Sequence, residues 1–224
     1  MSKDRAVLLY GSHARGDADE ISDVDVLVIG QEQLEPQEVA TLLSAACRGT
    51  LHISHYRWDE LEAMSEYGSL FLHHIAAEAK AIRYEGKSQE RLTKVLASLR
   101  PYQLAARDLS AFRTTVCDVE IGLRAGLPPC FELAVLGGVA RHASVLGCYL
   151  AGSPTFGRNS IARAADLFGM HAAQGDLALA HRFRLFEEGQ CDAPGEVSEA
   201  DVGHVLALLS TFLDRLEEMI YANA

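Results

Sequence analysis

Residues 10–30 read YGSHARGDADEISDVDVLVIG. A Gly-Ser pair near the start of this stretch is followed by a polar loop, and then by two aspartates at the beginning of an otherwise apolar strand-like segment. Asp23 and Asp25 are separated by a single valine, and the apolar run that follows them is typical of a buried strand. Residues two apart in a strand face the same side of the sheet, so the two carboxylates are predicted to project together. Buried without partners they would repel each other strongly, and a divalent cation would remove that cost.

The pair Gly11 and Ser12 predicts the other half of a binding site. A strand that leads into glycine and then serine at a helix start presents backbone N–H groups and a hydroxyl that can hold phosphate oxygens. Mg²⁺ prefers hard oxygen ligands and commonly combines one or two carboxylates with substrate phosphates. The alternative is two solvated aspartates at a strand end, which an isolated D-x-D pattern would favour. The Gly-Ser pair at this spacing favours the site instead.

Outward from this segment, the first part of the chain alternates short strands with helices. Four segments have the composition and alternation of strands: residues 5–10, 24–29, 51–56 and 80–84. After Gly86 the alternation stops and long helical periodicities take over. We therefore predict an α+β domain over residues 1–86, with a mixed sheet and helices, and a helical bundle over residues 87–224.

Composition limits the possible partners and the location of the protein. The chain has 224 residues, of which 49% are hydrophobic, and its formal net charge of −11 argues against broad binding to nucleic acid. The apolar stretch 131–150 contains Glu132, Arg141 and His142, so we expect a core helix and no membrane span. The five cysteines are scattered, and charged residues with only a short apolar run open the chain. These features predict a reducing, cytoplasmic environment, and the apolar helices leave a homodimer open.

The motif formed by GS, ten further residues and DVDV resembles the signature of the DNA polymerase beta-like nucleotidyltransferase superfamily. More narrowly, the chain is similar to the minimal nucleotidyltransferase branch, which includes antitoxin and aminoglycoside-modifying relatives. The resemblance implies that Gly11 and Ser12 hold the phosphates of a nucleoside triphosphate. It also implies that Asp23 and Asp25 are catalytic ligands of Mg²⁺, the expected cofactor.

Two more residues of the motif acquire roles from the same resemblance. Arg15 and Ser22 are expected to support the nucleotide-binding loop, with Arg15 near phosphate. The implied reaction transfers a nucleoside monophosphate from a nucleoside triphosphate, with ATP as the expected donor. The acceptor is a hydroxyl of a small molecule or of a partner protein.

The chain departs from the family pattern at one position. Active members carry a third carboxylate on a later strand, but the segment LHISHY at residues 51–56 contains no acid. His52 stands at the expected position, whereas Asp59 and Glu60 follow too late. One hypothesis is that His52 replaces the carboxylate as general base, since imidazole titrates near neutral pH. The other is a catalytically weak or inactive, nucleotide-binding interaction protein similar to an antitoxin subunit.

Overall fold

The computed structural model describes residues 4–43 and 47–222. The chain divides into two compact units, Met1–Gln103 and Leu104–Ala224, each with its own core. The expected boundary after Gly86 therefore lies 17 residues too early, counted from 86 to 103.

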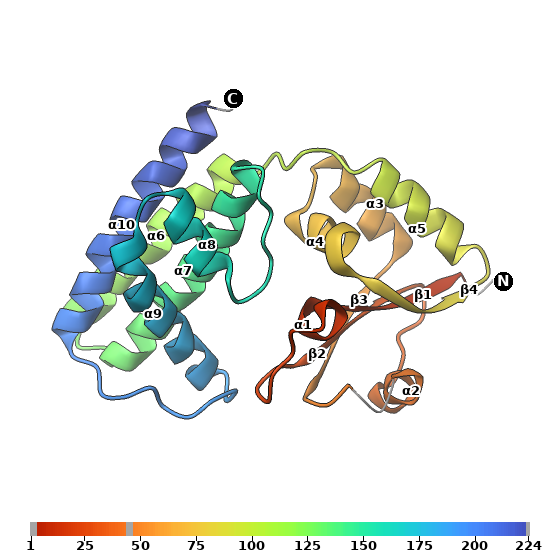
Figure 1. The fold of residues 1–224 in the computed structure, drawn as a ribbon, viewed down its shortest axis with the longest axis horizontal. Helices are drawn as coiled ribbons and strands as arrows, with labels where there is room; N and C mark the ends of the chain where they lie inside the picture. Colours follow the sequence, from red (N-terminus) through yellow and green to blue (C-terminus); the bar gives the residue numbers. More distant parts are fainter. Residues whose placement is uncertain (1–3, 44–46, 223–224) are drawn as a thin grey trace. The chain divides into compact units, whose positions relative to one another are not determined.

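A four-stranded mixed sheet organises the first unit (Figure 1). Its strands are β1 (Arg5–Tyr10), β2 (Val24–Ile29), β3 (Leu51–Tyr56) and β4 (Lys80–Glu85), in the order β3-β2-β1-β4. β1 runs antiparallel to both β2 and β4, and β2 runs parallel to β3. The mixed sheet and its helices confirm the predicted α+β fold class.

Helices cover both faces of this sheet. They are α1 (Gly11–Arg15), α2 (Pro36–Leu42), α3 (Trp58–Glu66), α4 (Leu70–Glu78) and α5 (Ser88–Ala97). On one face, side chains from β1 and β2 pack with α3, α4 and α5, among them Leu8, Leu27, Leu61 and Leu72. On the other face, β1 and β2 contribute valines that pack around Val39 of α2.

Helix α5 explains the position of the domain boundary. Its residues Leu92 and Val95 are 4% and 3% exposed and belong to the core between the sheet and α3 and α4. The long helical periodicity after Gly86 was correct for α5, but this helix completes the sheet domain. Periodicity identifies an apolar stripe without identifying the surface that the stripe contacts.

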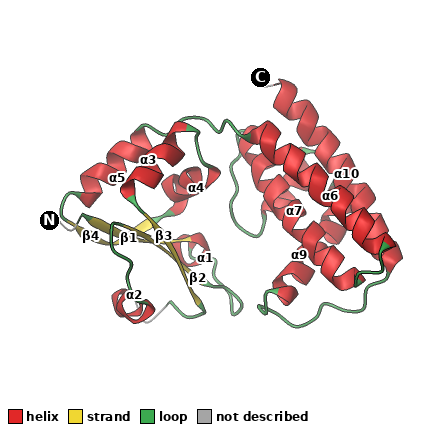
Figure 2. Cartoon of the chain, turned by 180° about the vertical axis from the view of Figure 1, so that it is seen from behind, coloured by secondary structure: helices red, strands yellow, loops and turns green. Residues whose placement is uncertain are grey.

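The second unit is helical (Figure 2). Its helices are α6 (Ala105–Arg124), α7 (Pro129–Leu150), α8 (Ser160–Leu167), α9 (Gln174–Glu187) and α10 (Glu199–Ala222), with a short 3₁₀ turn at His171–Ala173. The central helix is α7, which contacts each of the other four. Helix α6 begins at Ala105. The bundle confirms the helical character predicted for this part of the chain.

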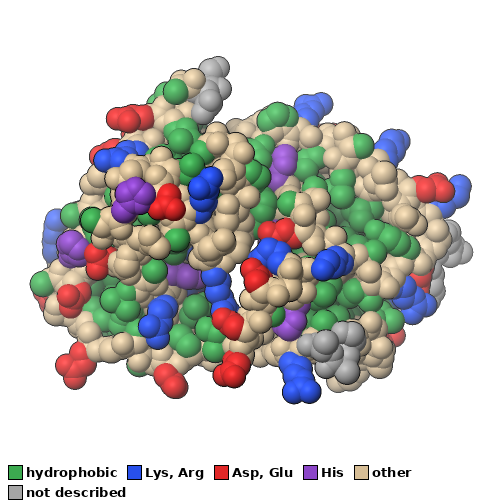
Figure 3. All heavy atoms as spheres, viewed as in Figure 1, with side chains coloured by type: hydrophobic (Ala, Val, Ile, Leu, Met, Phe, Trp, Pro, Cys, Tyr) green, Lys and Arg blue, Asp and Glu red, His purple; other side chains and the backbone are tan. Residues whose placement is uncertain are grey.

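Within the described residues, α7 alone is long and apolar enough to cross a membrane by length and composition, and 61% of its apolar window is buried. All five cysteines lie in the described part of the chain, and none of them forms a disulfide there. On the face shown in Figure 3, Lys and Arg side chains alternate with Asp and Glu and form no continuous basic surface.

Candidate functional site

Asp25 lies directly against the Gly-Ser turn of the first unit. β1 and β2 pair antiparallel with Tyr10 opposite Asp25, so the chain that leaves β1 at Gly11 passes over this carboxylate. Gly11 has φ +71°, and a Cβ atom placed on it would lie 2.5 Å from Asp25 Oδ2. Only glycine combines this conformation with such a close approach. The structure thus brings together Gly11 and Asp25, two residues that the sequence predicted to share a site.

Asp23 precedes β2 in a segment that is held from the opposite side by Gly49 and Thr50. The Val24 N–H donates to the Thr50 carbonyl at 2.9 Å. Gly49 has φ +138°, and it packs so closely on the Ser22 carbonyl that a side chain would collide with it. The Asp23 side chain is 19% exposed. The position of Asp23 is therefore set through its two chain neighbours, Ser22 and Val24, whose backbones contact residues 49–50.

The two carboxylates form an electrostatically strained pair. Burial raises the pKa of Asp25, and the charge of Asp23 raises it further. The charges of His52, His74 and His13 act in the opposite direction, and the net shift is upward. An excess of negative charge in a partly buried position favours binding of a cation.

His52 lies beside this pair, at the position expected for it. In the parallel register of β2 and β3 it is the neighbour of Asp25, and its Nδ1 lies 3.9 Å from Asp23 Oδ2. Its side chain is 54% exposed, so the imidazole is accessible to a ligand.

Asp59 and Glu60, the two later acidic residues, make their contacts at the start of α3. Asp59 accepts hydrogen bonds from the Arg57 guanidinium at 3.1 Å, and Glu60 accepts from the Arg57 backbone N–H at 2.6 Å. These contacts cap the first turn of the helix. In the part of the chain that the structure describes, no group of three or more His, Cys, Asp or Glu side chains is arranged to hold a metal ion.

The pair Asp23 and Asp25 nevertheless fits Mg²⁺. This ion keeps several waters and is usually bound through one or two carboxylates together with substrate phosphates. Asp23 and Asp25 can supply the two carboxylate ligands, and the adjacent Gly-Ser turn is suited to phosphate. The pKa of Asp25 is raised by burial and by the charge of Asp23, and a bound cation would relieve this repulsion.

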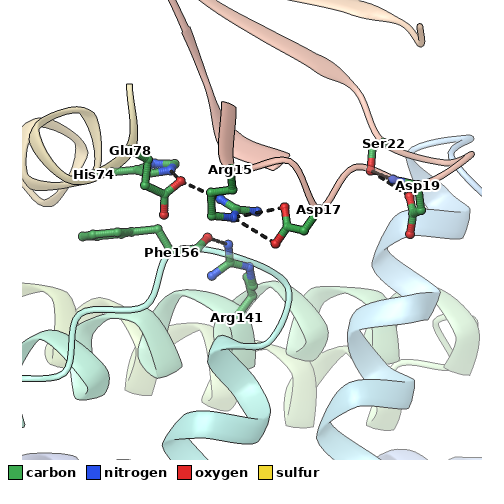
Figure 4. A network of polar contacts seen from close by, with 8 residues as sticks. All are labelled: Arg15, Asp17, Asp19, Ser22, His74, Glu78, Arg141 and Phe156. Atoms are coloured by element: carbon green, nitrogen blue, oxygen red, sulfur yellow. Dashed lines mark hydrogen bonds and ion pairs between the residues drawn. The ribbon is translucent and has the colours of Figure 1, made fainter. Parts of the chain in front are cut away.

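Arg15 lies in an ion-pair network that joins α1 to α4 (Figure 4). Its Nη1 donates to Glu78 Oε2 at 2.6 Å, and its Nε donates to Asp17 at 3.1 Å. His74 Nε2 lies 2.9 Å from the same Glu78 oxygen. Burial raises the pKa of Glu78, but hydrogen bonds and charges from His74 and Arg15 outweigh it and lower the pKa overall.

Ser12 and Ser22 hold the two ends of the loop. The Ser12 carbonyl accepts the backbone N–H groups of Gly16 and Asp17 at 2.9 and 3.1 Å, which closes α1. The Ser22 hydroxyl donates to Asp19 Oδ1 at 2.7 Å and accepts from the Asp19 N–H at 2.9 Å (Figure 4). Ser22 is 4% exposed. The geometry gives Ser22 a loop-capping contact, and its proposed role toward nucleotide stays a prediction.

Four residues at this site were not identified from the sequence. Tyr10 lies between Asp25 and α4, with its hydroxyl 3.1 Å from Ser54 Oγ and its ring edge-on to His74 at 5.5 Å. His13 has a buried Nε2 without a hydrogen-bond partner among the described residues. The spacing of four between His74 and Glu78 on the predicted helix could have paired these two residues. No sequence signal marked Tyr10 or His13, because their placement depends on strand pairing and on the turn of the chain.

Comparison with known proteins agrees with this geometry. Residues 1–76 match the family model described as "Nucleotidyltransferase domain". A protein of Methanocaldococcus jannaschii, named as a candidate protein adenylyltransferase, is 47% identical over 45 residues. That match covers 20% of this chain and 46% of the relative's length.

The match over residues 1–76 confirms the resemblance found in the sequence and is consistent with the minimal nucleotidyltransferase superfamily. It contains both motif segments, from Gly11 to Asp25, and the strand that carries His52. The similarity supports transfer from a nucleoside triphosphate as the activity of this domain. The helical unit lies outside the matched residues.

Proposed function

We propose that the protein is a Mg²⁺-dependent nucleotidyltransferase that transfers a nucleoside monophosphate, from ATP as the expected donor, to a hydroxyl. The acceptor is a small molecule or a protein side chain. The observation that carries this proposal is the contact between Asp25 and Gly11, which places a carboxylate against the Gly-Ser turn of a nucleotidyltransferase domain. The absence of disulfides among the described cysteines and the proposed use of a nucleoside triphosphate suit a cytoplasmic enzyme.

In the proposed reaction, the acceptor oxygen attacks the α-phosphorus of the nucleotide. A new O–P bond forms, the bond between the α-phosphorus and the bridging oxygen breaks, and pyrophosphate leaves with the bonding electron pair. Bound Mg²⁺ supplies charge stabilisation on the phosphates. Asp23 and Asp25 would hold it, and the backbone N–H groups at Gly11 and Ser12 would orient the phosphates.

His52 is the proposed acceptor of the hydroxyl proton. It is half exposed, lies 3.9 Å from Asp23 and neighbours Asp25 in the sheet. These carboxylates would stabilise the imidazolium that forms when the proton is taken up. The contribution expected of a positioned general base is about 10²–10⁴-fold in rate.

The test is pyrophosphate release from ATP and Mg²⁺ by the full chain, with a panel of hydroxyl acceptors. We expect Asp25→Asn to reduce release to background, because the substitution removes one of two carboxylates that would hold the cation. Equal release from the native chain and from Asp25→Asn would remove the proposal.

Asp59→Asn is the matched control in the same unit. Asp59 is 65% exposed and binds Arg57 at the start of α3. Its substitution is expected to leave pyrophosphate release unchanged. A loss as large as that of Asp25→Asn would indicate that Asp59 supplies the third carboxylate.

A second candidate function is nucleotide binding without transfer, as in an antitoxin-like interaction subunit. It is favoured by the imidazole at the position where the family has a carboxylate, because hard cations prefer oxygen ligands. The two functions differ in the effect of His52→Ala. For the enzyme we expect a fall of roughly 10²-fold in kcat with little change in ATP affinity. For the binding protein, calorimetry would show ATP binding in both chains and no pyrophosphate release from either.

A further inference from the structure

The helical unit contains a buried histidine with an unsatisfied nitrogen. His181 of α9 is 7% exposed, and its Nδ1 is buried without a hydrogen-bond partner among the described residues. A buried polar atom left unpaired costs free energy, so it is retained where a ligand or another partner satisfies it. A phenylalanine ring would fill the same space without the free-energy cost of an unpaired nitrogen.

Close packing of α7 on α9 places basic side chains around this histidine. A Cβ atom on Gly137 would lie 2.8 Å from the His181 backbone nitrogen, so the two helices touch through their backbones at this point. A Cβ atom on Gly138 would lie 3.7 Å from Arg184 Cδ. Arg184 follows His181 by three residues on α9, so the two side chains lie on the same side of the helix.

Arg141 extends the same region to the segment that precedes α8. It lies one helical turn beyond Gly137 on α7, and its Nη1 donates to Ser160 Oγ at 2.9 Å. Its Nη2 donates to the carbonyl of Phe156 (Figure 4). Ser160 is fully buried and Phe156 is 7% exposed, so these contacts fix the guanidinium.

The charges that act on His181 have one sign. Burial and nearby basic side chains together lower the pKa of His181 to about 4, and burial has the largest effect. The basic side chains that act on it are Arg141, Arg184, Arg158 and His142. At neutral pH the imidazole is therefore neutral, and a cation would be repelled from its surroundings. Arg184 shares its charge with Glu188, whose Oε1 accepts from Arg184 Nε at 2.8 Å, so the positive charge around His181 is partly compensated within this chain of net charge −11.

We propose that the helical unit binds a phosphate-class oxyanion at His181, between α7, α9 and the segment that Arg141 holds. The His181 imidazole would donate from Nδ1, and the surrounding guanidinium groups would supply the positive charge. Planar guanidinium groups match tetrahedral oxyanions through paired N–H donors, which favours phosphate over chloride. This site is assigned from residues of the helical unit alone and does not rest on the proposed transfer reaction.

The experiment uses the full chain without Mg²⁺ and follows the ¹⁵N resonances of the His181 imidazole by NMR. Inorganic phosphate is titrated at constant ionic strength, with chloride and acetate as the comparison anions. We expect a saturable shift of the His181 resonances with phosphate and no saturable shift with chloride. Equal responses to phosphate and chloride, or no response, would overturn the proposal, and saturable binding of acetate with equal affinity would exclude selectivity for phosphate.

Charge variants locate the site. Arg184→Gln is expected to weaken phosphate binding by roughly tenfold, as expected when a charge-assisted contact is removed. Arg113→Gln is the matched control, because Arg113 of α6 pairs with Asp214 and Glu217 at 2.8 and 2.6 Å and should not affect His181. Equal affinity in the native chain and in Arg184→Gln would contradict the assignment.

His181→Phe separates binding from a structural role. It removes the unsatisfied nitrogen while keeping a ring, so the thermal midpoint should be unchanged or higher. Phosphate affinity, now followed at the Arg184 Nε–H resonance, should fall at least about tenfold. Native affinity in a folded His181→Phe chain would show that the imidazole takes no part.

Discussion

Gly11 decides whether a carboxylate can lie against the Gly-Ser turn. Its positive φ of +71° acts together with the close approach of Asp25, whose Oδ2 would lie only 2.5 Å from a Cβ atom at this position. A side chain at this position would add backbone strain and would require the Asp25 carboxylate to move away from the turn.

We predict that Gly11→Ala lowers the free energy of unfolding by about 2–4 kcal/mol, since backbone strain and a steric collision add. It should also weaken ATP binding, because Asp25 must move from the turn. Urea unfolding and calorimetry with ATP measure the two effects. Gly16→Ala is the control, because Gly16 has φ +88° with nothing within 4 Å of a Cβ, so it should show the backbone strain alone. Equal losses for the two variants would remove the steric argument.

Asp25 is expected to reduce the stability of the folded protein at neutral pH. Burial and the charge of Asp23 raise its pKa in the folded protein, so folding favours the protonated form. Stability from this group is therefore highest below the unfolded pKa and falls as pH rises through the folded pKa.

At neutral pH, in the absence of divalent cations, we predict that Asp25→Asn increases the free energy of unfolding by about 1 kcal/mol, the size of a like-charge repulsion near solvent. Added Mg²⁺ and ATP should raise the thermal midpoint of the native chain and leave the variant unchanged, since the variant lacks one of the two carboxylates. A variant less stable than the native chain in EDTA would show that Asp25 is satisfied by protein contacts.

At the scale of the elements, the pairing of Arg15 with Glu78 connects the short helix α1 to α4. The Arg15 and Glu78 side chains are 24% and 12% exposed, and His74 shares the Glu78 carboxylate. A five-residue helix has little stability of its own, so this contact helps to hold the Gly-Ser turn in place.

We predict that Glu78→Gln destabilises the protein by about 1–3 kcal/mol at neutral pH, because a partly buried charged hydrogen bond is lost. The lowered pKa of Glu78 means that its contribution is present above the unfolded pKa and is lost as pH falls through the folded value. Urea unfolding between neutral and acidic pH should therefore show a shallower acid dependence for Glu78→Gln than for the native chain.

Glu62→Gln is the matched control on the same unit. Its partner Arg91 lies at 2.7 Å, but the side chains are 51% and 39% exposed. The expected loss is below about 1 kcal/mol, as for other solvent-exposed ion pairs. A larger effect at Glu62 than at Glu78 would contradict the assigned importance of the α1–α4 contact.

At the scale of the whole molecule, the boundary between Gln103 and Leu104 makes a prediction about fragments. A fragment of residues 1–103 should unfold cooperatively, whereas 1–86 lacks Leu92 and Val95 of the core. Loss of these two buried side chains should cost about 3–6 kcal/mol, from about 1.5–3 kcal/mol each. Circular dichroism with urea titration measures the difference, and equal stability of the two fragments would place α5 outside the folding unit.

Much of the fold could be predicted from local patterns. The bounds expected for β1, β2 and β3 agree with the structure, because β1 and β2 are short, mainly apolar runs and β3 alternates apolar with polar residues. The destination of α5 could not be predicted, because its apolar stripe would suit either unit. Helix α6 begins at Ala105, because Pro101 is followed by three residues outside any helix.

The candidate site divides in the same way. The sequence by itself determined that a Gly-Ser turn and two carboxylates belong to one motif, because spacing and strand periodicity are local properties. Only the tertiary structure decided that Asp25 touches Gly11, that His52 neighbours the pair, and that His74 and Glu78 hold Arg15. These contacts depend on strand register and helix packing between segments up to 63 residues apart, and no local pattern specifies such distances.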